Sequence, residues 1–309
     1  MSAAHYLDRN LQDREVERVL RHAWHPVARI QQLAANSAIE CRLLNEPITI
    51  IREHDTVRGW ALTGADAAHA RRNRRESGSR LAVEVWNGFV MVNRDHDAHP
   101  LAPQLVPLTT HLKPYALYDR IQLDVHEATA GWDWKLSMEY FNLSMEVGRS
   151  GVLSQHLADA VEVDPDGAWS LLYGLARSRG RGHGIFPMCE DLPPEYRTRI
   201  NVINVFPTLH LVTDATMALW IQLHVEGPQR HLLRWSLLLP ERSLAAAKAG
   251  GRLDHYCEIL RVLLEDDLHT LTRASEPQQV LDAFSERSEL KFVQRLHRWL
   301  SHQESERIE

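Results

Sequence analysis

Short apolar runs rich in β-branched residues recur along this 309-residue chain, and they constrain its fold more than any other feature. In the first third of the chain these runs occupy residues 27–30, 41–44, 48–51, 81–86 and 88–93. Runs of this length and composition predict β-strands. Asn87-Gly88 separates the last two runs, and this dipeptide favours the positive φ angles of a tight hairpin turn. We therefore predict a small antiparallel β-domain that ends near residue 95.

Segments with helical spacing flank these strands. The apolar residues within residues 7–24 follow a mostly helical spacing, which predicts a helix that leads into the first sheet. The second part of the chain contains three longer apolar runs and becomes helical after Glu241. The three runs are residues 199–206, 219–225 and 232–239, and the later helical segments are residues 256–271 and 290–300. The chain is predicted to be an α+β protein, with a small β-domain over residues 1–98 and a larger helix-flanked antiparallel sheet over residues 99–309.

Composition narrows the class of protein. Hydrophobic residues make up 44% and charged residues 25% of the chain, as in globular proteins, and the net charge of -6 argues against binding to nucleic acid or an anionic membrane. Cys41, Cys189 and Cys257 are too few and too far apart for a disulfide framework. The N-terminus lacks the apolar core of a signal peptide, and no apolar run approaches the ~18 residues of a membrane span. We therefore expect a cytoplasmic protein.

Several phrases, in the same order over most of the chain, resemble the terminal oxygenase (alpha) subunit of Rieske non-haem iron oxygenases, especially the demethylase or monooxygenase-like branch. These phrases are WHPVA at 24–28, LLNEPITIIR at 43–52, VEVWNGFVMVN at 83–93, DWK at 133–135, VFP at 205–207, LLLP at 237–240, LED at 264–266 and LHRWL at 296–300. The resemblance implies a Rieske-like β-domain over residues 1–98 and an oxygenase catalytic-like domain over residues 99–309.

The resemblance also identifies what the first domain lacks. A Rieske [2Fe–2S] centre takes two thiolates and two imidazoles from Cys-x-His and Cys-x-x-His motifs, and neither motif occurs in this chain. Where the first cluster loop should follow residues 60–62, the chain continues as TGADAAH over residues 63–69. No cysteine lies between Cys41 and Cys189. We therefore expect no [2Fe–2S] cluster.

The second centre of the family is a mononuclear iron held by two histidines and one carboxylate. The resemblance places it on a helix with the pattern Asp-x-x-His-x-x-x-x-His. In this chain the first histidine position falls on Met145 or Glu146, and the second falls on Ser150 or Gly151. Only the carboxylate ligand is kept, as Asp266. Because a single carboxylate cannot hold ferrous iron against water, we expect no metal at these vestigial positions.

The resemblance also implies that this chain lacks the acidic residue that, in the family, links the two metal centres across the subunit boundary. Its position falls on Asn142 or Leu143, so the electron bridge is lost as well. A rebuilt iron site could draw on Glu146, Asp266 and His156, but His156 is too far along the helix to share a face with Glu146 at the usual spacing of four residues.

An arginine-rich stretch follows the position of the lost cluster loop. Arg71, Arg72, Arg74 and Arg75 could form a patch that docks a partner protein, because complementary charge orients two proteins as they meet. A solvated surface loop explains the same residues equally well.

Three functions are consistent with these features. The leading hypothesis is a pseudo-enzyme, a non-catalytic alpha-type subunit without cofactors that assembles with an intact Rieske oxygenase subunit and supports it in a trimer-based hetero-oligomer. The first alternative is a mono- or dioxygenase component with a non-standard iron site, fed by a Rieske cluster on another polypeptide. The second alternative is a binding module that holds a small hydrophobic ligand in the vestigial cavity.

Overall fold

The computed structural model describes residues 4–62, 78–147, 160–163, 168–175, 186–189 and 191–251, together with residues 253–255, 257–258, 261–262, 265, 299–300 and 303. The N-terminal segment is helical, as predicted, but in three short pieces. These are α1 (Ala4–Leu7), α2 (Arg9–Arg18) and a 3₁₀ turn, η1 (Leu20–His22). Asp8 begins α2 because its carboxylate accepts hydrogen bonds from the amides of Asn10 and Leu11.

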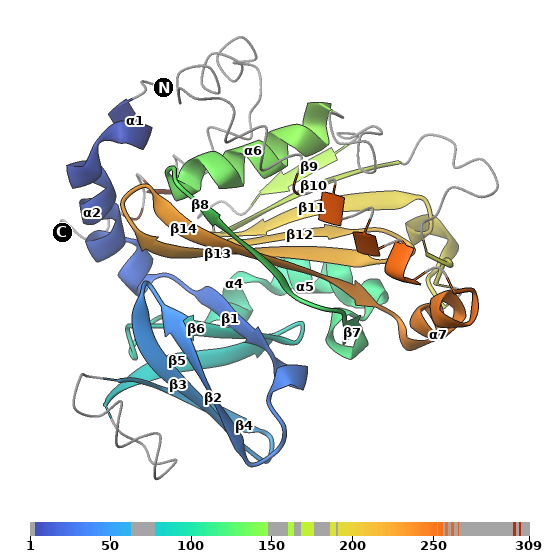
Figure 1. The fold of residues 1–309 in the computed structure, drawn as a ribbon, viewed down its shortest axis with the longest axis horizontal. Helices are drawn as coiled ribbons and strands as arrows, with labels where there is room; N and C mark the ends of the chain where they lie inside the picture. The colour runs from blue at the N-terminus through green and yellow to red at the C-terminus, as the bar shows by residue number, and fades with distance from the viewer. Residues whose placement is uncertain are drawn as a thin grey trace.

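Six antiparallel strands then form the first sheet, in the order β1-β6-β5-β4-β3-β2 (Figure 1). They are β1 (His25–Arg29), β2 (Ser37–Leu43), β3 (Glu46–Glu53), β4 (Thr56–Ala61), β5 (Ser79–Trp86) and β6 (Phe89–Asn93), with a 3₁₀ turn η2 (Ile30–Gln32) between β1 and β2. The predicted hairpin is confirmed: Trp86 pairs with Phe89 across Asn87 and Gly88, whose φ angles are 47° and 83°. The arginine-rich stretch at residues 71–75 lies outside the described residues.

Arg29 ties this hairpin to the segment that leads into the second sheet. The guanidinium is 1% exposed and stacks on Phe89, 4.5 Å from the ring centre. It donates one hydrogen bond to the carbonyl of Asn87 and one to the carbonyl of Leu117, both at 2.7 Å. A Cβ atom on Gly88 would come within 2.7 Å of this guanidinium, so glycine serves both the turn and the packing of Arg29.

Short helices connect the two sheets. They are α4 (Leu101–Gln104), α5 (Val106–Leu112), η3 (Lys113–Tyr115) and η4 (Leu117–Asp119). The second sheet has eight strands, in the order β7-β14-β13-β12-β11-β10-β9, with β8 pairing on β14 beside β7. Its strands are β7 (Ile121–Gln122), β8 (His126–Ala130), β9 (Ala160–Val163), β10 (Trp169–Leu175), β11 (Arg199–Val205), β12 (Leu209–Thr213), β13 (Ala218–Gly227) and β14 (Arg230–Leu239). Three further helical pieces are α6 (Trp134–Val147), η5 (Pro194–Tyr196) and α7 (Glu241–Ala249).

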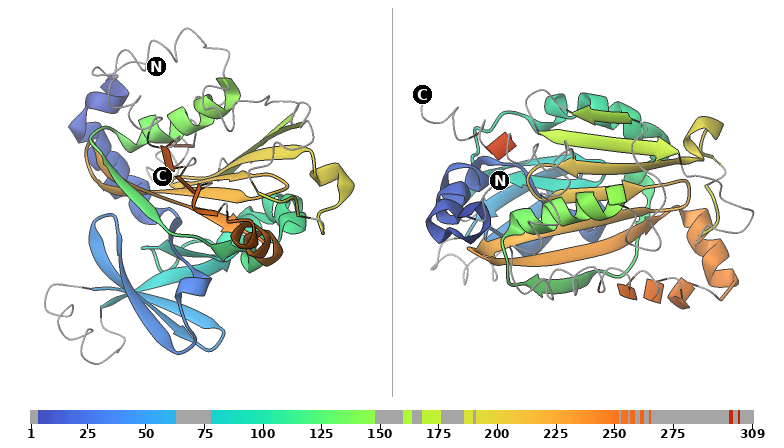
Figure 2. Two further views of the ribbon diagram at one scale, coloured as in Figure 1. Left: turned by 45° about the vertical axis from the view of Figure 1, so that its right-hand side comes forward. Right: turned by 90° about the horizontal axis from the view of Figure 1, so that it is seen from above.

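Both faces of the second sheet are buried. On one face α6 lies across the strands, and its Trp134, Met138 and Phe141 join a core with Val212 and Leu219 (Figures 1 and 2). The opposite face carries α4, α5 and the first sheet, and its apolar side chains form a second core. The antiparallel sheets and accompanying helices confirm the predicted α+β class, whereas the predicted domain boundary at residue 98 stays a prediction.

Hydrogen bonds join the two sheets directly. His25 on β1 lies 2.9 Å from the hydroxyl of Thr208, and the side chain of Gln222 on β13 donates to the carbonyl of Pro26 at 2.5 Å. The other ring nitrogen of His25 lies 2.7 Å from the carbonyl of Leu20 and must therefore carry the proton. None of the helices among the described residues is long and apolar enough to span a membrane.

The packing around Gly88 gives a first prediction. Gly88→Ala should lower the free energy of unfolding by about 2 kcal/mol, because alanine is strained at this φ angle and displaces the Arg29 guanidinium. Gly131→Ala is the matched control, since no atom lies within 4 Å of its added Cβ. Chemical denaturation of both variants measures the difference, and equal stabilities would contradict this role for Gly88.

Candidate functional site

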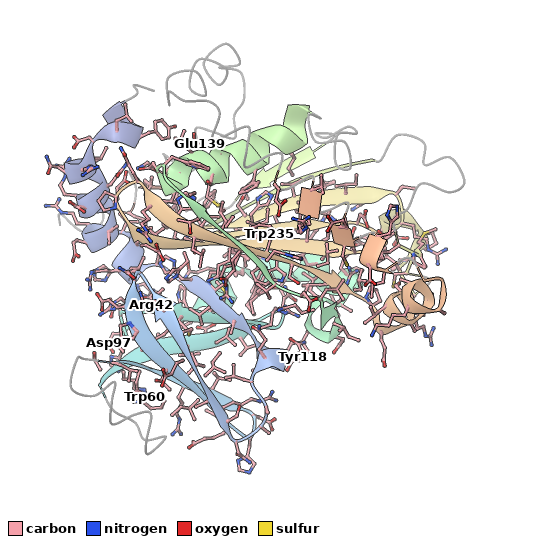
Figure 3. All side chains as sticks on the ribbon, viewed as in Figure 1. Arg42, Trp60, Asp97, Tyr118, Glu139 and Trp235 are labelled. Atoms are coloured by element: carbon pink, nitrogen blue, oxygen red, sulfur yellow. The ribbon has the colours of Figure 1, made fainter. Side chains whose placement is uncertain are left out.

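The candidate site lies around α6, the helix on which the sequence resemblance places the iron ligands. Asp133 precedes the helix, and its carboxylate accepts a hydrogen bond of 2.8 Å from the amide of Lys135, as an N-terminal cap does. Leu136, Met138 and Phe141 are buried against the sheet. The opposite flank of the helix faces the N-terminal helices, and Glu139 marks that flank (Figure 3).

A buried ionic network fixes α6 to the N-terminal helices. The ammonium of Lys135 is fully buried, lies 3.1 Å from the carboxylate of Asp133 and forms a second ion pair with Glu15 of α2. Burial raises the pKa of Asp133, while the charge of Lys135 opposes that shift. One turn further along α6, both carboxylate oxygens of Glu139 accept from the hydroxyl of Tyr6, at 2.9 and 2.7 Å.

A second polar network fixes the same end of α6 to the sheet. The Ser137 hydroxyl accepts a hydrogen bond from the indole of Trp132 and lies 2.9 Å from Nε2 of His231 on β14. The carbonyl of Trp132 lies 3.0 Å from Nδ1 of the same ring. Because a carbonyl can only accept, His231 carries its proton on Nδ1 and accepts from Ser137 at Nε2. Burial lowers the pKa of His231 to about 4, so the ring is neutral.

Further along the sheet, a line of polar side chains crosses three strands on the face that α6 covers. Asn204 on β11 donates to the Ser170 hydroxyl on β10 at 3.0 Å, and its amide oxygen lies 2.8 Å from Nδ1 of His210 on β12. The His210 ring lies 5.8 Å from that of Phe141 on α6. Its Nε2 is buried without a hydrogen-bond partner, and burial lowers the pKa of His210 to about 3. His210 is therefore a neutral imidazole with a free lone pair beside α6.

The structure locates part of the predicted site. Asn142, Leu143, Met145 and Glu146 all belong to α6, so this segment is helical as the resemblance implies. The structure describes the backbone of these four residues but not their side chains. The remaining vestigial ligand positions, Ser150, Gly151 and Asp266, and the candidate docking residues Arg71, Arg72, Arg74 and Arg75 also lie outside the described residues.

The residues of this chain do not fit a Rieske cluster. Cys41 is the single cysteine within residues 1–98, and it lies in β2, paired with Ile48 of β3. Burial raises the pKa of its thiol to about 12, whereas a cluster ligand must be a thiolate. All three cysteines are free.

The residues around α6 do not fit the family's mononuclear iron either. No histidine occurs between Trp134 and Val147, and the next one in the chain is His156. His210 offers one imidazole nitrogen, but within the described ranges no group of three or more His, Cys, Asp and Glu side chains is placed to hold a metal ion. The facial arrangement needs two imidazoles and a carboxylate.

Sequence reasoning missed Lys135, His231 and His210 as members of the site. Lys135 lies within a phrase that supports the resemblance, but its partner Glu15 is 120 residues away in the chain. His210 lies between apolar residues in the short strand β12. A polar residue within an apolar run is the sequence signal that could have indicated a buried polar contact here.

The Lys135 network gives a second prediction. Lys135→Met should lower the free energy of unfolding by about 3–5 kcal/mol, because it leaves buried carboxylates without their counter-ion. Arg230→Met is the control, since Arg230 forms an exposed pair with Glu226 and its loss should change stability by less than about 0.5 kcal/mol. Equal losses in urea denaturation would show that the network does not hold α6 in place.

The buried histidines give a third prediction, on pH. The pKa values of His25 and His231 are lowered to about 4 by burial, against about 6.5 in an unfolded chain. The unfolded chain therefore binds protons first as the pH falls, and each histidine should cost about 2 kcal/mol of stability between pH 7 and pH 5. His231→Gln should flatten this pH dependence, and His96→Gln, at an exposed residue, should not. The same slope in both variants would contradict the prediction.

Comparison with known proteins tests the fold. No model of a protein family and no curated protein matches this sequence. Among solved structures, a quaternary ammonium Rieske monooxygenase that oxidises carnitine is 16% identical, with a TM-score of 0.66 over 88% of this chain and 84% of that one. Naphthalene 1,2-dioxygenase from Rhodococcus sp. is 15% identical, with a TM-score of 0.56 over 84% of this chain and 82% of that one.

A third match extends over nearly the whole chain. The terminal oxygenase of carbazole 1,9a-dioxygenase from Nocardioides aromaticivorans IC177 is 14% identical, with a TM-score of 0.52 over 99% of this chain and 98% of that one. At these identities the similarity concerns the fold. This chain therefore has the fold of the terminal oxygenase components of Rieske oxygenases, as the resemblance in its sequence predicted.

Proposed function

We propose that this chain is a non-catalytic subunit with the Rieske oxygenase fold, and that it assembles with an intact oxygenase subunit in a cytoplasmic, trimer-based hetero-oligomer. In this role it supports assembly or shapes the active site of its neighbour. It binds neither a [2Fe–2S] cluster nor a mononuclear iron of its own.

The main support for this proposal is the lack of cysteines that could bind a Rieske cluster. A Rieske cluster needs two cysteine thiolates on one iron, and the first domain contains Cys41 alone. Cys189 and Cys257 lie far along the chain, and neither stands in a Cys-x-His or Cys-x-x-His motif. Without a cluster of its own, the chain has no electron donor of the Rieske kind.

The residues of α6 support the proposal that the chain binds no mononuclear iron. The helix supplies no imidazole over its whole length, so the strongest ligands of the facial site are missing from it. Its anchoring contacts are instead made by the protein itself, through Lys135 and Glu139 on one flank and Ser137 on the other. The helix thus has its place in the fold without a metal ion.

The proposed partnership draws on the architecture of the matching enzymes. The quaternary ammonium monooxygenase transfers electrons between its subunits, which requires one chain to lie closely against the next. Because this chain has the same fold, we infer that it can present the same elements of the fold to a neighbouring subunit. A subunit without metal ligands could therefore occupy one place in the assembly while an intact subunit performs the chemistry.

Co-purification tests the proposal. The full chain carries an affinity tag and is co-expressed with the proteins encoded beside its gene. The expected result is recovery of an intact oxygenase subunit at a fixed ratio, in a complex whose turnover is unchanged when Glu146 and Asp266 are replaced by Gln and Asn in this chain.

Two outcomes would contradict the proposal. If no oxygenase subunit is recovered by co-purification, the assembly role fails. If the substitutions at Glu146 and Asp266 remove both iron and turnover, the chain is an oxygenase component with a non-standard iron site. An untagged chain that elutes at the size of its complex serves as the control for interference by the tag.

A further inference from the structure

A cavity beside the start of α7 contains a buried arginine with unused hydrogen-bond donors. The cavity has a volume of ≈ 540 Å³, within the size range of small-molecule sites. Its described walls come from the η3–η4 segment, from residues 187–189 and 191 and from the start of α7, and none of these lining residues belongs to α6. Tyr118, labelled in Figure 3, lies in η4.

Arg120 lies in the wall of this cavity. Its side chain is 2% exposed, and its Nε donates to the carbonyl of Tyr115 at 2.9 Å. Both terminal nitrogens, Nη1 and Nη2, are buried and have no hydrogen-bond partner. Arg29 is the other arginine buried to this degree among the described residues. Both of its terminal nitrogens donate hydrogen bonds to backbone carbonyls.

An unpaired guanidinium inside a protein is costly, because the charge and its N–H groups lose their hydration. Burial lowers the pKa of Arg120, and the carboxylate of Asp214 acts in the opposite direction through space. Oδ1 of Asp214 already accepts from the amide and hydroxyl of Thr216 and from the amide of Met217, at 2.6 to 3.0 Å. Asp214 thus offsets part of the charge but forms no hydrogen bond with Arg120.

The missing partner must supply two oxygen acceptors to Nη1 and Nη2. A carboxylate does this best, because its two oxygens match the spacing of the two guanidinium nitrogens. The cavity mouth sets a second condition, since Asp119, Asp191 and Glu241 are exposed there. Apart from the buried Arg120, the described lining residues include one positive charge, that of the exposed Arg242, 3.7 Å from Asp191. An acidic mouth disfavours ligands with several negative charges.

We infer that this cavity binds a small monocarboxylate whose remaining part is neutral or cationic, and that Arg120 holds the carboxylate through both terminal nitrogens. The binding requires a small local adjustment that brings the ligand oxygens against the buried nitrogens. The described lining residues include none of the vestigial iron positions, and binding at this cavity involves neither a metal ion nor a partner subunit.

Ligand-observed NMR on the full chain tests this inference. The probes are propionate and glycine betaine as monocarboxylates, with citrate and inorganic phosphate as multiply charged comparators. We expect the two monocarboxylates to bind more tightly than either comparator. Arg120→Gln should weaken their binding at least about tenfold, because a pair of hydrogen bonds to a charged group is lost.

Arg242→Gln is the matched control, at an exposed arginine of the same cavity, and should change monocarboxylate affinity by less than about threefold. Arg120→Lys keeps the positive charge but not the paired donors, so it should also weaken binding and serves if Arg120→Gln does not fold. Thermal unfolding of each variant checks that it is folded.

Three results would overturn the inference. These are the absence of monocarboxylate binding to the unaltered chain, unchanged affinity in a folded Arg120 variant, and tighter binding of citrate or phosphate than of propionate. Each measurement uses the isolated chain, so it neither supports nor weakens the proposed partnership with an oxygenase subunit.

Discussion

Both faces of the eight-stranded sheet are buried, and this constraint governs how its polar side chains are placed. Such a side chain has no access to water, so its hydrogen bonds are made within the protein, and a group such as Nε2 of His210 that finds no partner is an exception. Asn204 meets Ser170 and His210 on the α6 side, and on the opposite side Asn201 meets His111 and Thr213. The fold is held by apolar packing and these internal contacts.

This constraint explains how a chain can keep an oxygenase fold without the ligands of its metal centres. The helix on which the resemblance places the iron ligands, α6, is anchored through its first half, by Lys135 and Glu139 toward α2 and α1 and by Ser137 toward β14. These contacts lie upstream of Met145 and Glu146. Changes at the ligand positions therefore leave the anchoring residues in place, and fold and chemistry can be lost separately.

Much of the fold could be predicted from local sequence. The Asn87-Gly88 turn and strands β11, β13 and β14 follow from dipeptide preference and long apolar runs. Strands β10 and β12 were missed, because Ser170, Gly174 and His210 interrupt their short apolar runs. Ser170 and His210 both meet Asn204 on a neighbouring strand, and no local pattern reveals such a partner.

The sites were harder to predict than the fold, for the same reason. Motif comparison pointed to the segment that forms α6 and to the missing cysteine motifs, since both depend on residue type and spacing. It could not indicate that Lys135 pairs with Glu15, or that Arg120 is buried with unused hydrogen-bond donors. Both features depend on which residues, distant in the sequence, the fold places next to each other. Burial and partnership are properties of the folded chain.

Whether this chain has a metal centre of its own is measured by the iron and acid-labile sulfide content of protein purified anaerobically with iron supplied. We expect negligible iron and sulfide per chain. Two iron and two sulfide per chain would mean that a cluster forms despite the missing thiols, and near one iron without sulfide would mean that α6 and its surroundings bind iron through ligands other than the family's histidines.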